Sequence, residues 1–270
     1  MKSLKDQLGR VLMLRAIPKR IISLVPSQTE LLCDLGLTSL IVGVTKFCIH
    51  PLDIRNRAVV VGGTKQVHLD KIKALKPDII LCNKEENTKE MVEACALFCD
   101  VHVSNIYDIE DSKELITQYG DIFERQHTAE KLILLIEREF QDFNKFIANK
   151  PALKTAYFIW KNPWMVSANN TFVNYLLQLN KLENVFLDKT RYPEIDLKIE
   201  SKNRQFDLVL LSSEPYPFKS EHIKEVQAFL PNTPIILVDG EMFSWYGSRL
   251  AKAFQYFKAL RLSLQNNQSL

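Results

Sequence analysis

Short apolar runs alternate with amphipathic segments through the first 104 residues of the chain. The runs are rich in branched side chains and have the length of buried strands; they are RIISLV (20–25), IVGVTKFC (41–48), VVVGG (59–63), DIILC (78–82) and CDVHVS (99–104). Helical spacing begins after Pro26 and again in the segment that Pro77 ends. Ser27, with Glu30 three residues later, has the spacing of a capping box. This alternation predicts a mainly parallel α/β sheet.

The same plan returns in the second half of the chain. Strand-like runs occur at 155–160, 206–211 and 234–239, and segments with helical spacing occur at 169–179, 220–230 and from about Trp245 to Leu264. Between the halves, apolar side chains recur at helical spacing over 128–149, about 33 Å of helix. We therefore predict an α/β protein of two Rossmann-like lobes, 1–124 and 151–270, joined by one long backbone helix at 125–150.

Two stretches of sequence repeat one another across the halves. The two stretches are PDIILCNKEEN (77–87) and FDLVLLSSEPY (206–216). In each of them the second residue is an Asp, an apolar run follows, and a Glu stands seven positions after the Asp. ELLCDLG (30–36) is echoed in the same way by NYLLQLN (174–180). We expect two related lobes that face each other across a cleft, each with a carboxylate on the loop after a buried strand, where α/β sheets bind ligands.

Composition excludes several classes of protein. A net charge of +3, with 25% charged residues, is too small to indicate nucleic-acid binding. The phosphate-binding patterns GxGxxG and GxxxxGK[ST] do not occur. The five cysteines are odd in number, which favours a reducing compartment. No secretory signal is visible, so a cytoplasmic protein is expected if Met1 is the natural start, and a periplasmic one if a signal was removed.

The segments that follow the predicted strands contain aromatic side chains and few charges. All three tryptophans are among them, and ring faces suit a flat, amphipathic ligand. The alternative is that these rings fill the cores of the lobes. The candidate ligand-binding residues in these segments are Phe47, Cys48, His50, Gly63, Thr64, Trp160, Trp164, Phe243, Trp245 and Tyr246.

Cysteine and histidine after the second strand raise a metal or a catalytic hypothesis. Cys48 and His50, with His68 and Cys82, could form a soft metal site, although the spacing lacks a known zinc pattern. His50 alone could be an axial ligand to a metal already held in a macrocycle. Cys48 could be a nucleophile with His50 or His68 as base, but residues i and i+2 of an extended segment point to opposite faces.

Glutamates follow matched strands in the two halves. Glu85, Glu86 and Glu214 are expected to lie too far apart for the paired acid and base of a glycosidase, whose carboxyls lie within about 10 Å. Matched carboxylates on two lobes suit docking onto a pseudo-symmetric basic partner. The alternative is that they are solvated loop charges.

The order of these motifs resembles one known family. KRIISLVPSQTELLCDLGL (19–37), IVGVTKFCIHP (41–51) and VVGGTKQVHLDKIKALKPDIIL (60–81) are similar to the helical-backbone metal receptors, and DQLGRVLML (6–14) looks like that family's first hairpin. These receptors are the substrate-binding proteins of ABC importers for cobalamin, ferric siderophores, haem and some metal ions. LLSSEPYPFKSEH (210–222) and GEMFSWYG (240–247) resemble the cobalamin-binding branch most.

The resemblance implies a monomeric, non-enzymatic binding protein with no intrinsic cofactor, whose ligand is a corrinoid or another metal chelate held in the cleft. Phe47, Trp164, Trp245 and Phe243 fall near segments that line the pocket in the cobalamin branch. In that family one Glu from each lobe pairs with arginines of the permease, and Glu85 or Glu86 with Glu214 match those positions. Two alternatives remain: a cytoplasmic paralogue that delivers a corrinoid or metal, and a thiol- or metal-dependent enzyme on the same scaffold.

Overall fold

The computed structural model describes residues 2–266, and these form two compact units. Unit 1 comprises the chain up to Glu137 together with Trp245–Leu250, and unit 2 comprises Arg138–Ser244 and the chain from Ala251 onward. The short segment Trp245–Leu250 therefore belongs to unit 1, although the residues before and after it belong to unit 2. Within the described part of the chain, no helix is both long and apolar enough to cross a membrane.

Unit 1 is built on a parallel sheet, as predicted. In spatial order its strands are β5 (Val59–Val60), β4 (Ile41–Val44), β3 (Ile21–Ser23), β6 (Ile79–Asn83) and β7 (Asp100–Ser104). The chain starts at β3 in the middle and adds strands first on one side and then on the other, which is the doubly wound plan. The expected first hairpin is confirmed as the antiparallel pair β1 (Lys2–Lys5) and β2 (Val11–Leu14).

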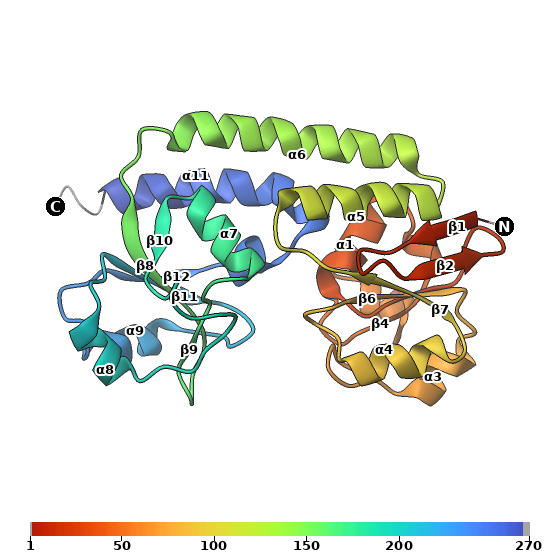
Figure 1. Ribbon diagram of the computed structural model, residues 1–270, viewed down its shortest axis with the longest axis horizontal. Helices are drawn as coiled ribbons and strands as arrows, with labels where there is room; N and C mark the ends of the chain where they lie inside the picture. The colour runs from red at the N-terminus through yellow and green to blue at the C-terminus, as the bar shows by residue number, and fades with distance from the viewer. Residues whose placement is uncertain (1, 267–270) are drawn as a thin grey trace. The chain divides into compact units, whose positions relative to one another are not determined.

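Helices cover both faces of this sheet (Figure 1). They are α1 (Pro26–Asp34), α2 (Ile54–Arg57), α3 (Leu69–Ala74), α4 (Lys89–Ala96) and α5 (Ile109–Ile122), with the 3-10 turns η1 (Thr38–Leu40) and η2 (Gly247–Arg249). Ile22 and Ile80 of the sheet pack with Ile72 of α3 and Cys95 of α4 in one buried cluster. Burial on both faces explains why the strands are apolar runs rather than alternating ones.

The expected N-cap at Ser27 is wrong. Helix α1 begins one residue earlier, at Pro26, and its N-cap is Val25, which makes no side-chain capping hydrogen bond. Pro26 explains the shift, because proline has no N–H to be capped and its fixed φ suits the first position of a helix. Ser27 and Glu30 are instead buried residues inside the helix.

Unit 2 has a sheet of the same kind. Its parallel strands are β10 (Leu182–Asn184), β8 (Leu153–Trp160), β11 (Leu208–Ser212) and β12 (Ile235–Val238), and β9 (Met165–Val166) pairs with β8 in the antiparallel direction. Its helices are α7 (Phe172–Leu179), α8 (Leu197–Asn203), α9 (Ser220–Gln227), α10 (Gly240–Ser244) and α11 (Leu250–Asn266). Phe158 and Val209 of the sheet pack with Leu197 and Val226 of α8 and α9.

The long helix predicted over 128–149 is α6 (Gln126–Ile147), which begins in unit 1 and ends in unit 2. Within unit 2, Phe143 of α6 packs against Phe254 and Phe257 of α11. Helix α11 begins at Leu250, after η2, rather than near Trp245. The lobe limits 1–124 and 151–270 stay a prediction.

Candidate functional site

The loop after β4 presents an aromatic and an imidazole side chain in unit 1. Phe47 is 49% exposed, and the ammonium group of Lys46 lies 5.0 Å from the centre of its ring. A Cβ atom at Gly63 would approach the Phe47 ring to 3.3 Å, so a larger residue there would require the ring to shift by a few tenths of an ångström. Phe47 and Gly63, both predicted from their positions after strands, are therefore neighbours. The neighbouring Thr64 uses its carbonyl oxygen to accept a hydrogen bond from the Asn87 side chain.

His50 lies beside Trp245 within the same unit. The two ring centroids are 5.4 Å apart and the planes make an angle of 80°, an edge-to-face contact. Trp245 is only 6% exposed, and the Arg249 guanidinium lies 4.6 Å from its ring centre. Arg249 in turn donates two hydrogen bonds to Glu30, at 2.7 and 2.9 Å. A buried ion pair thus holds the ring that His50 touches.

Tyr246 belongs to a buried polar network rather than to a surface. Its hydroxyl accepts a hydrogen bond of 3.0 Å from the Gln28 amide, which also donates to Ser104 at 2.7 Å. The other side of the amide, Oε1, accepts the hydroxyl of Tyr119 at 2.6 Å. Burial raises the pKa of both tyrosines, so both stay neutral donors and acceptors at neutral pH. The network fixes the segment that carries Trp245.

The hypothesis of a metal site with four ligands is wrong for the described residues. Nowhere in residues 2–266 do three His, Cys, Asp or Glu side chains come together as they would to hold a metal ion. Cys48 is fully buried, and its sulfur lies 3.1 Å from the hydroxyl of Thr29 and 3.3 Å from that of Thr45. Burial also raises the pKa of this thiol, which makes it a poor nucleophile. His50 as a single axial ligand stays a prediction.

In unit 2 the candidate aromatics divide into exposed and buried rings. Trp160 ends β8 and is 39% exposed, and its ring makes an edge-to-face contact with Tyr216 at a centroid distance of 5.6 Å. Trp164 is half-buried and stacks on Phe218 at 6.1 Å. Phe243 is completely buried between Tyr157 and Phe257, at 5.1 and 4.8 Å. Its position favours the alternative interpretation of this ring as a core residue.

The glutamates that follow the matched strands are fixed in corresponding ways. Asn83, the last residue of β6, accepts the backbone N–H groups of Glu85 at 2.8 Å and Glu86 at 3.1 Å on its Oδ1. Ser212, the last residue of β11, donates to the carbonyl of Glu214 at 2.6 Å and accepts its N–H at 3.3 Å. In each unit a buried polar side chain at the strand end holds the loop that carries the carboxylate.

Sequence reasoning missed several residues that organise these segments. Asn83 and Ser212 occupy equivalent positions in the two repeated stretches, so an alignment of the repeats could have revealed them. Ser244, which donates to a carboxylate oxygen of Glu214 at 2.6 Å, carries no such signal. Neither does the ion pair of Glu30 and Arg249, because 219 positions separate the two residues.

Comparisons with known proteins agree with this architecture. The chain is 26% identical over 250 residues to a vitamin B12-binding protein of Pectobacterium atrosepticum, with 89% of this chain and 87% of that protein covered. It is 25% identical over 187 residues to an ABC transporter substrate-binding lipoprotein of Bacillus subtilis, with 66% of this chain and 59% of that protein covered.

Solved structures share the fold. A periplasmic heme binding protein from Pseudomonas aeruginosa superposes with a TM-score of 0.80 at 19% identity, covering 90% of this chain and 92% of that one. The periplasmic vitamin B12 binding protein of Vibrio cholerae superposes with a TM-score of 0.79 at 18% identity, covering 92% of this chain and 98% of that one. The profile of one protein family, described as periplasmic binding protein, matches residues 21–236. Because this match covers most of the chain, the chain belongs to the periplasmic binding protein family, whose members bind ligands for transport rather than catalyse reactions.

Proposed function

We propose that this protein binds a corrinoid or another metal chelate, such as haem or a ferric siderophore, and delivers it to an ABC permease. The observation that carries the proposal is that one loop after β4 carries both the exposed ring of Phe47 and the imidazole of His50, which makes an edge-to-face contact with Trp245. A macrocycle offers a flat apolar face to a ring and a metal to an imidazole. Relatives named for vitamin B12 binding support this class of ligand.

The imidazole of His50 is the residue of this chain that we assign to the metal of the chelate. It is half-buried, and the edge-to-face contact with Trp245 restricts its orientation. A restricted imidazole loses little conformational entropy when it binds, which favours affinity. The chelate brings its own metal, so the protein needs one ligand and no complete metal site.

The carboxylates of Glu85 or Glu86 and of Glu214 are proposed to dock onto basic side chains of the permease. All three are half-buried, on loops whose backbone is held by Asn83 or Ser212. A fixed loop presents its charge at low entropic cost, which suits recognition by arginine. We further propose that the receptor acts as a monomer, which sedimentation velocity tests.

The cysteines are compatible with a location outside the cytoplasm, which we propose. All five are free thiols, and burial raises the pKa of each of them. The thiolate is the form that oxidises, so a raised pKa slows oxidation. Their odd number therefore does not require a reducing compartment. Fractionation of cells with an antibody to this chain tests the proposal.

Calorimetric titration with cyanocobalamin, cobinamide, haemin and a ferric catecholate tests the ligand class. We expect micromolar or tighter binding to one of these chelates and a shift in its visible absorption. The shift should disappear in His50→Ala and persist in His68→Ala, whose imidazole is exposed and lies before α3. Absence of binding to all four chelates would overturn the proposed ligand class.

A further inference from the structure

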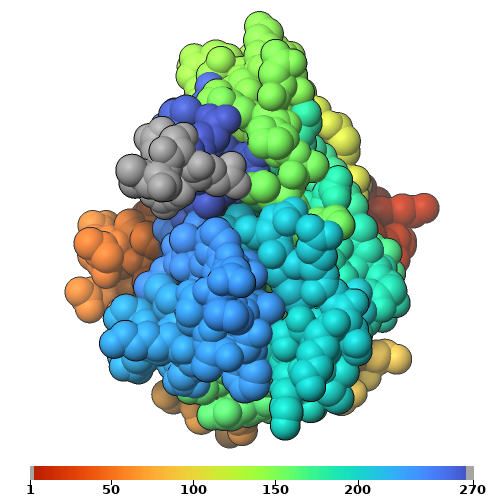
Figure 2. All heavy atoms as spheres, turned by 90° about the vertical axis from the view of Figure 1, so that its left-hand side faces the viewer, coloured from red at the N-terminus to blue at the C-terminus, as the bar shows by residue number. Residues whose placement is uncertain are grey.

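A basic cavity of about 840 Å³ lies within unit 2. Its walls come from the segment between α6 and β8, the end of α7, β10, and the segments after β10 and α8. These parts of the chain, green to cyan, reach the surface on the face that Figure 2 shows. Lys154 at the start of β8 lines the cavity, whereas Trp160 ends the same strand, about 20 Å away at the usual rise per residue. Within unit 2, the cavity therefore lies at the opposite end of β8 from Trp160, the candidate ligand-binding residue of that strand.

Three lysines of the cavity have no carboxylate partner among residues 2–266. Lys150 donates to the side-chain oxygen of Gln265 at 2.8 Å, and Lys154 donates to that of Gln205 at 2.7 Å. Lys181 donates to the backbone carbonyl of residue 148 at 2.5 Å. In each of these hydrogen bonds the acceptor is a neutral oxygen, so no negative charge in the described part of the chain balances the positive charge of the lysine. Each ammonium also has three N–H donors and uses one of them here.

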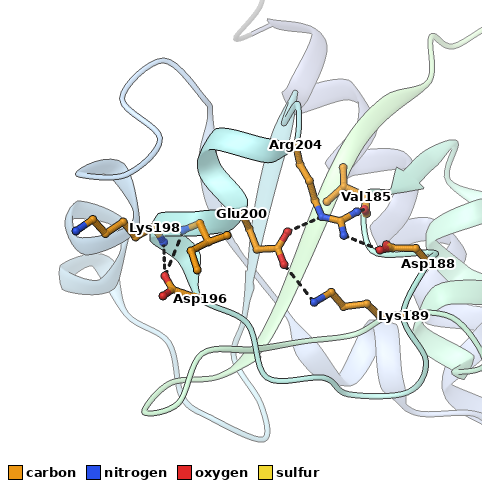
Figure 3. A network of polar contacts seen from close by, with 8 residues as sticks. Val185, Asp188, Lys189, Asp196, Lys198, Glu200 and Arg204 are labelled. Atoms are coloured by element: carbon orange, nitrogen blue, oxygen red, sulfur yellow. Dashed lines mark hydrogen bonds and ion pairs between the residues drawn. The ribbon is translucent and has the colours of Figure 1, made fainter.

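Arg204, the fourth cation of the cavity, differs because its charge is balanced (Figure 3). It donates to Glu200 at 2.6 Å and to Asp188 at 2.7 Å, and its other contact is the carbonyl of Val185. The ammonium of Lys189 shares Glu200 at 3.2 Å. This network is neutral as a whole, so the positive potential of the cavity comes from the three lysines.

One acidic residue, Glu183, lines the cavity. It stands opposite Lys154 on the neighbouring strand, with their Cα atoms in register. The Lys154 ammonium nevertheless bonds to Gln205 rather than to this carboxylate. Three lysines without a carboxylate partner among the described residues thus line the cavity together with one acidic residue. Apolar residues complete its wall: Ala152, Leu182, Val185 and Leu187.

We propose that this cavity binds an anion in which a phosphate or carboxylate group is attached to an apolar body. The spare N–H donors of the lysines would bind the anionic group, and the apolar wall would cover the body. The volume is within the range of small-molecule sites. Two sources share this chemistry: a soluble phosphate ester, or the headgroup of an anionic lipid. The inference does not depend on which chelate the protein carries.

Calorimetric titration of the full chain with phenyl phosphate, inorganic phosphate and phenol tests the chemistry. We expect phenyl phosphate to bind more tightly than inorganic phosphate and phenol not to bind, because charge and apolar area are both required. Affinity should fall as salt is added, since partly exposed charges are screened. Binding of phenol as tight as that of phenyl phosphate would contradict the proposal.

Single-charge variants give changes in opposite directions. Lys154→Gln and Lys181→Gln should each weaken binding of phenyl phosphate roughly two- to fivefold, and Glu183→Gln should strengthen it by a similar factor. Lys198→Gln is the matched control, because this exposed lysine lies in α8 and does not line the cavity. Equal affinity in all four variants would overturn the proposal.

Flotation with vesicles distinguishes the two sources. Binding to phosphatidylglycerol vesicles that Lys154→Gln weakens, without binding to glycerol phosphate, identifies a lipid headgroup as the ligand. Binding to glycerol phosphate alone identifies a soluble ester. If neither binds, and phenyl phosphate does not bind either, the cavity is not an anion site. Titration of the same sample with the chelates is an independent measurement, so failure here leaves the chelate proposal standing.

Discussion

Asp78 and Asp207 make the same contact in two different sheets. Asp78 accepts the backbone N–H groups of Lys19 and Arg20 at 2.8 and 2.9 Å, just before β3. Asp207 accepts the N–H of Lys154 at 2.8 Å, at the start of β8. Each Asp also donates its own N–H to a carbonyl there, at 2.8 Å. The repeated sequence motif thus corresponds to a repeated hydrogen-bonded unit, in which a carboxylate fixes the entry of the neighbouring parallel strand.

Removal of these carboxylates is expected to destabilise the protein. Asp78→Ala loses two accepted hydrogen bonds and should lower the free energy of unfolding by about 1–3 kcal/mol, and Asp207→Ala, which loses one, by about 1 kcal/mol. Urea unfolding followed by circular dichroism measures both values. Asp78→Asn is the matched control, because its amide keeps one acceptor oxygen. A loss as large in Asp78→Asn as in Asp78→Ala would show that the charge, and not the hydrogen bonds, carries the effect.

The buried ion pair between Glu30 and Arg249 should be important for the folding of unit 1. Arg249→Met leaves the Glu30 carboxylate buried without its partner, which costs about 3–5 kcal/mol. The double variant Glu30→Leu with Arg249→Met removes both charges and should recover most of this loss. Thermal unfolding measures the stability, and tryptophan fluorescence reports the ring of Trp245. A double variant no more stable than Arg249→Met would contradict this account.

The sequence predicted the sheets better than it predicted how distant segments meet. Apolar runs revealed the central strands, because burial on both faces needs continuous apolar sequence. Helix α5 was missed although Asp108 caps it. Its many polar residues interrupt the apolar residues at helical spacing, so the amphipathic pattern is weak over a few turns. Short elements such as β10 were missed for lack of length. The segment Trp245–Leu250 is bound to unit 1 by contacts such as that of Arg249 with Glu30, 219 positions earlier, and no local pattern encodes such a contact.

His102 is expected to make unit 1 sensitive to acid. The side chain is buried on β7, and burial lowers its pKa, while its hydrogen bond to Gln118 at 2.7 Å acts in the opposite direction. In the unfolded chain, His102 binds a proton below its ordinary pKa of about 6.5. In the folded protein its pKa is lower, so the same imidazole takes up the proton only at a lower pH. Stability should therefore fall as the pH decreases from about 6.5 toward the lower folded pKa, and this contribution is absent above 6.5.

The melting temperature between pH 7.5 and 5 measures this effect. His102→Phe keeps an aromatic ring beside Tyr119, whose centroid is 5.4 Å away, and should flatten the acid limb of the curve. His127→Ala, an exposed histidine of α6, is the control and should leave the curve unchanged. An acid limb that persists fully in His102→Phe would assign the sensitivity to other groups. Asp6, Arg10 and Glu114 are the charged groups that act electrostatically on this imidazole.

Thiol reactivity should be slow in the folded protein. Burial raises the pKa of Cys95 to about 11 and that of Cys99 to about 12, and Cys48 and Cys82 are fully buried. Cys33 is half-buried on α1 and should react first with a disulfide reagent such as DTNB. Stopped-flow and manual assays at pH 8 give the rates, and urea should release all five thiols. Persistence of the first phase in Cys33→Ser would contradict this order.

The two phenylalanines of the candidate site should behave in opposite ways. Phe47 is half exposed after β4, so Phe47→Ala should weaken chelate binding by about 1–2 kcal/mol while the urea midpoint stays unchanged. Phe243 is buried against Phe257 and Tyr157, so Phe243→Leu should lower the free energy of unfolding by about 1–2 kcal/mol and leave affinity unchanged. Titration with the chelate and urea unfolding, done on both variants, separate the two effects. Loss of affinity in Phe243→Leu at unchanged stability would place that ring at the ligand, and unchanged affinity in Phe47→Ala would remove Phe47 from the site.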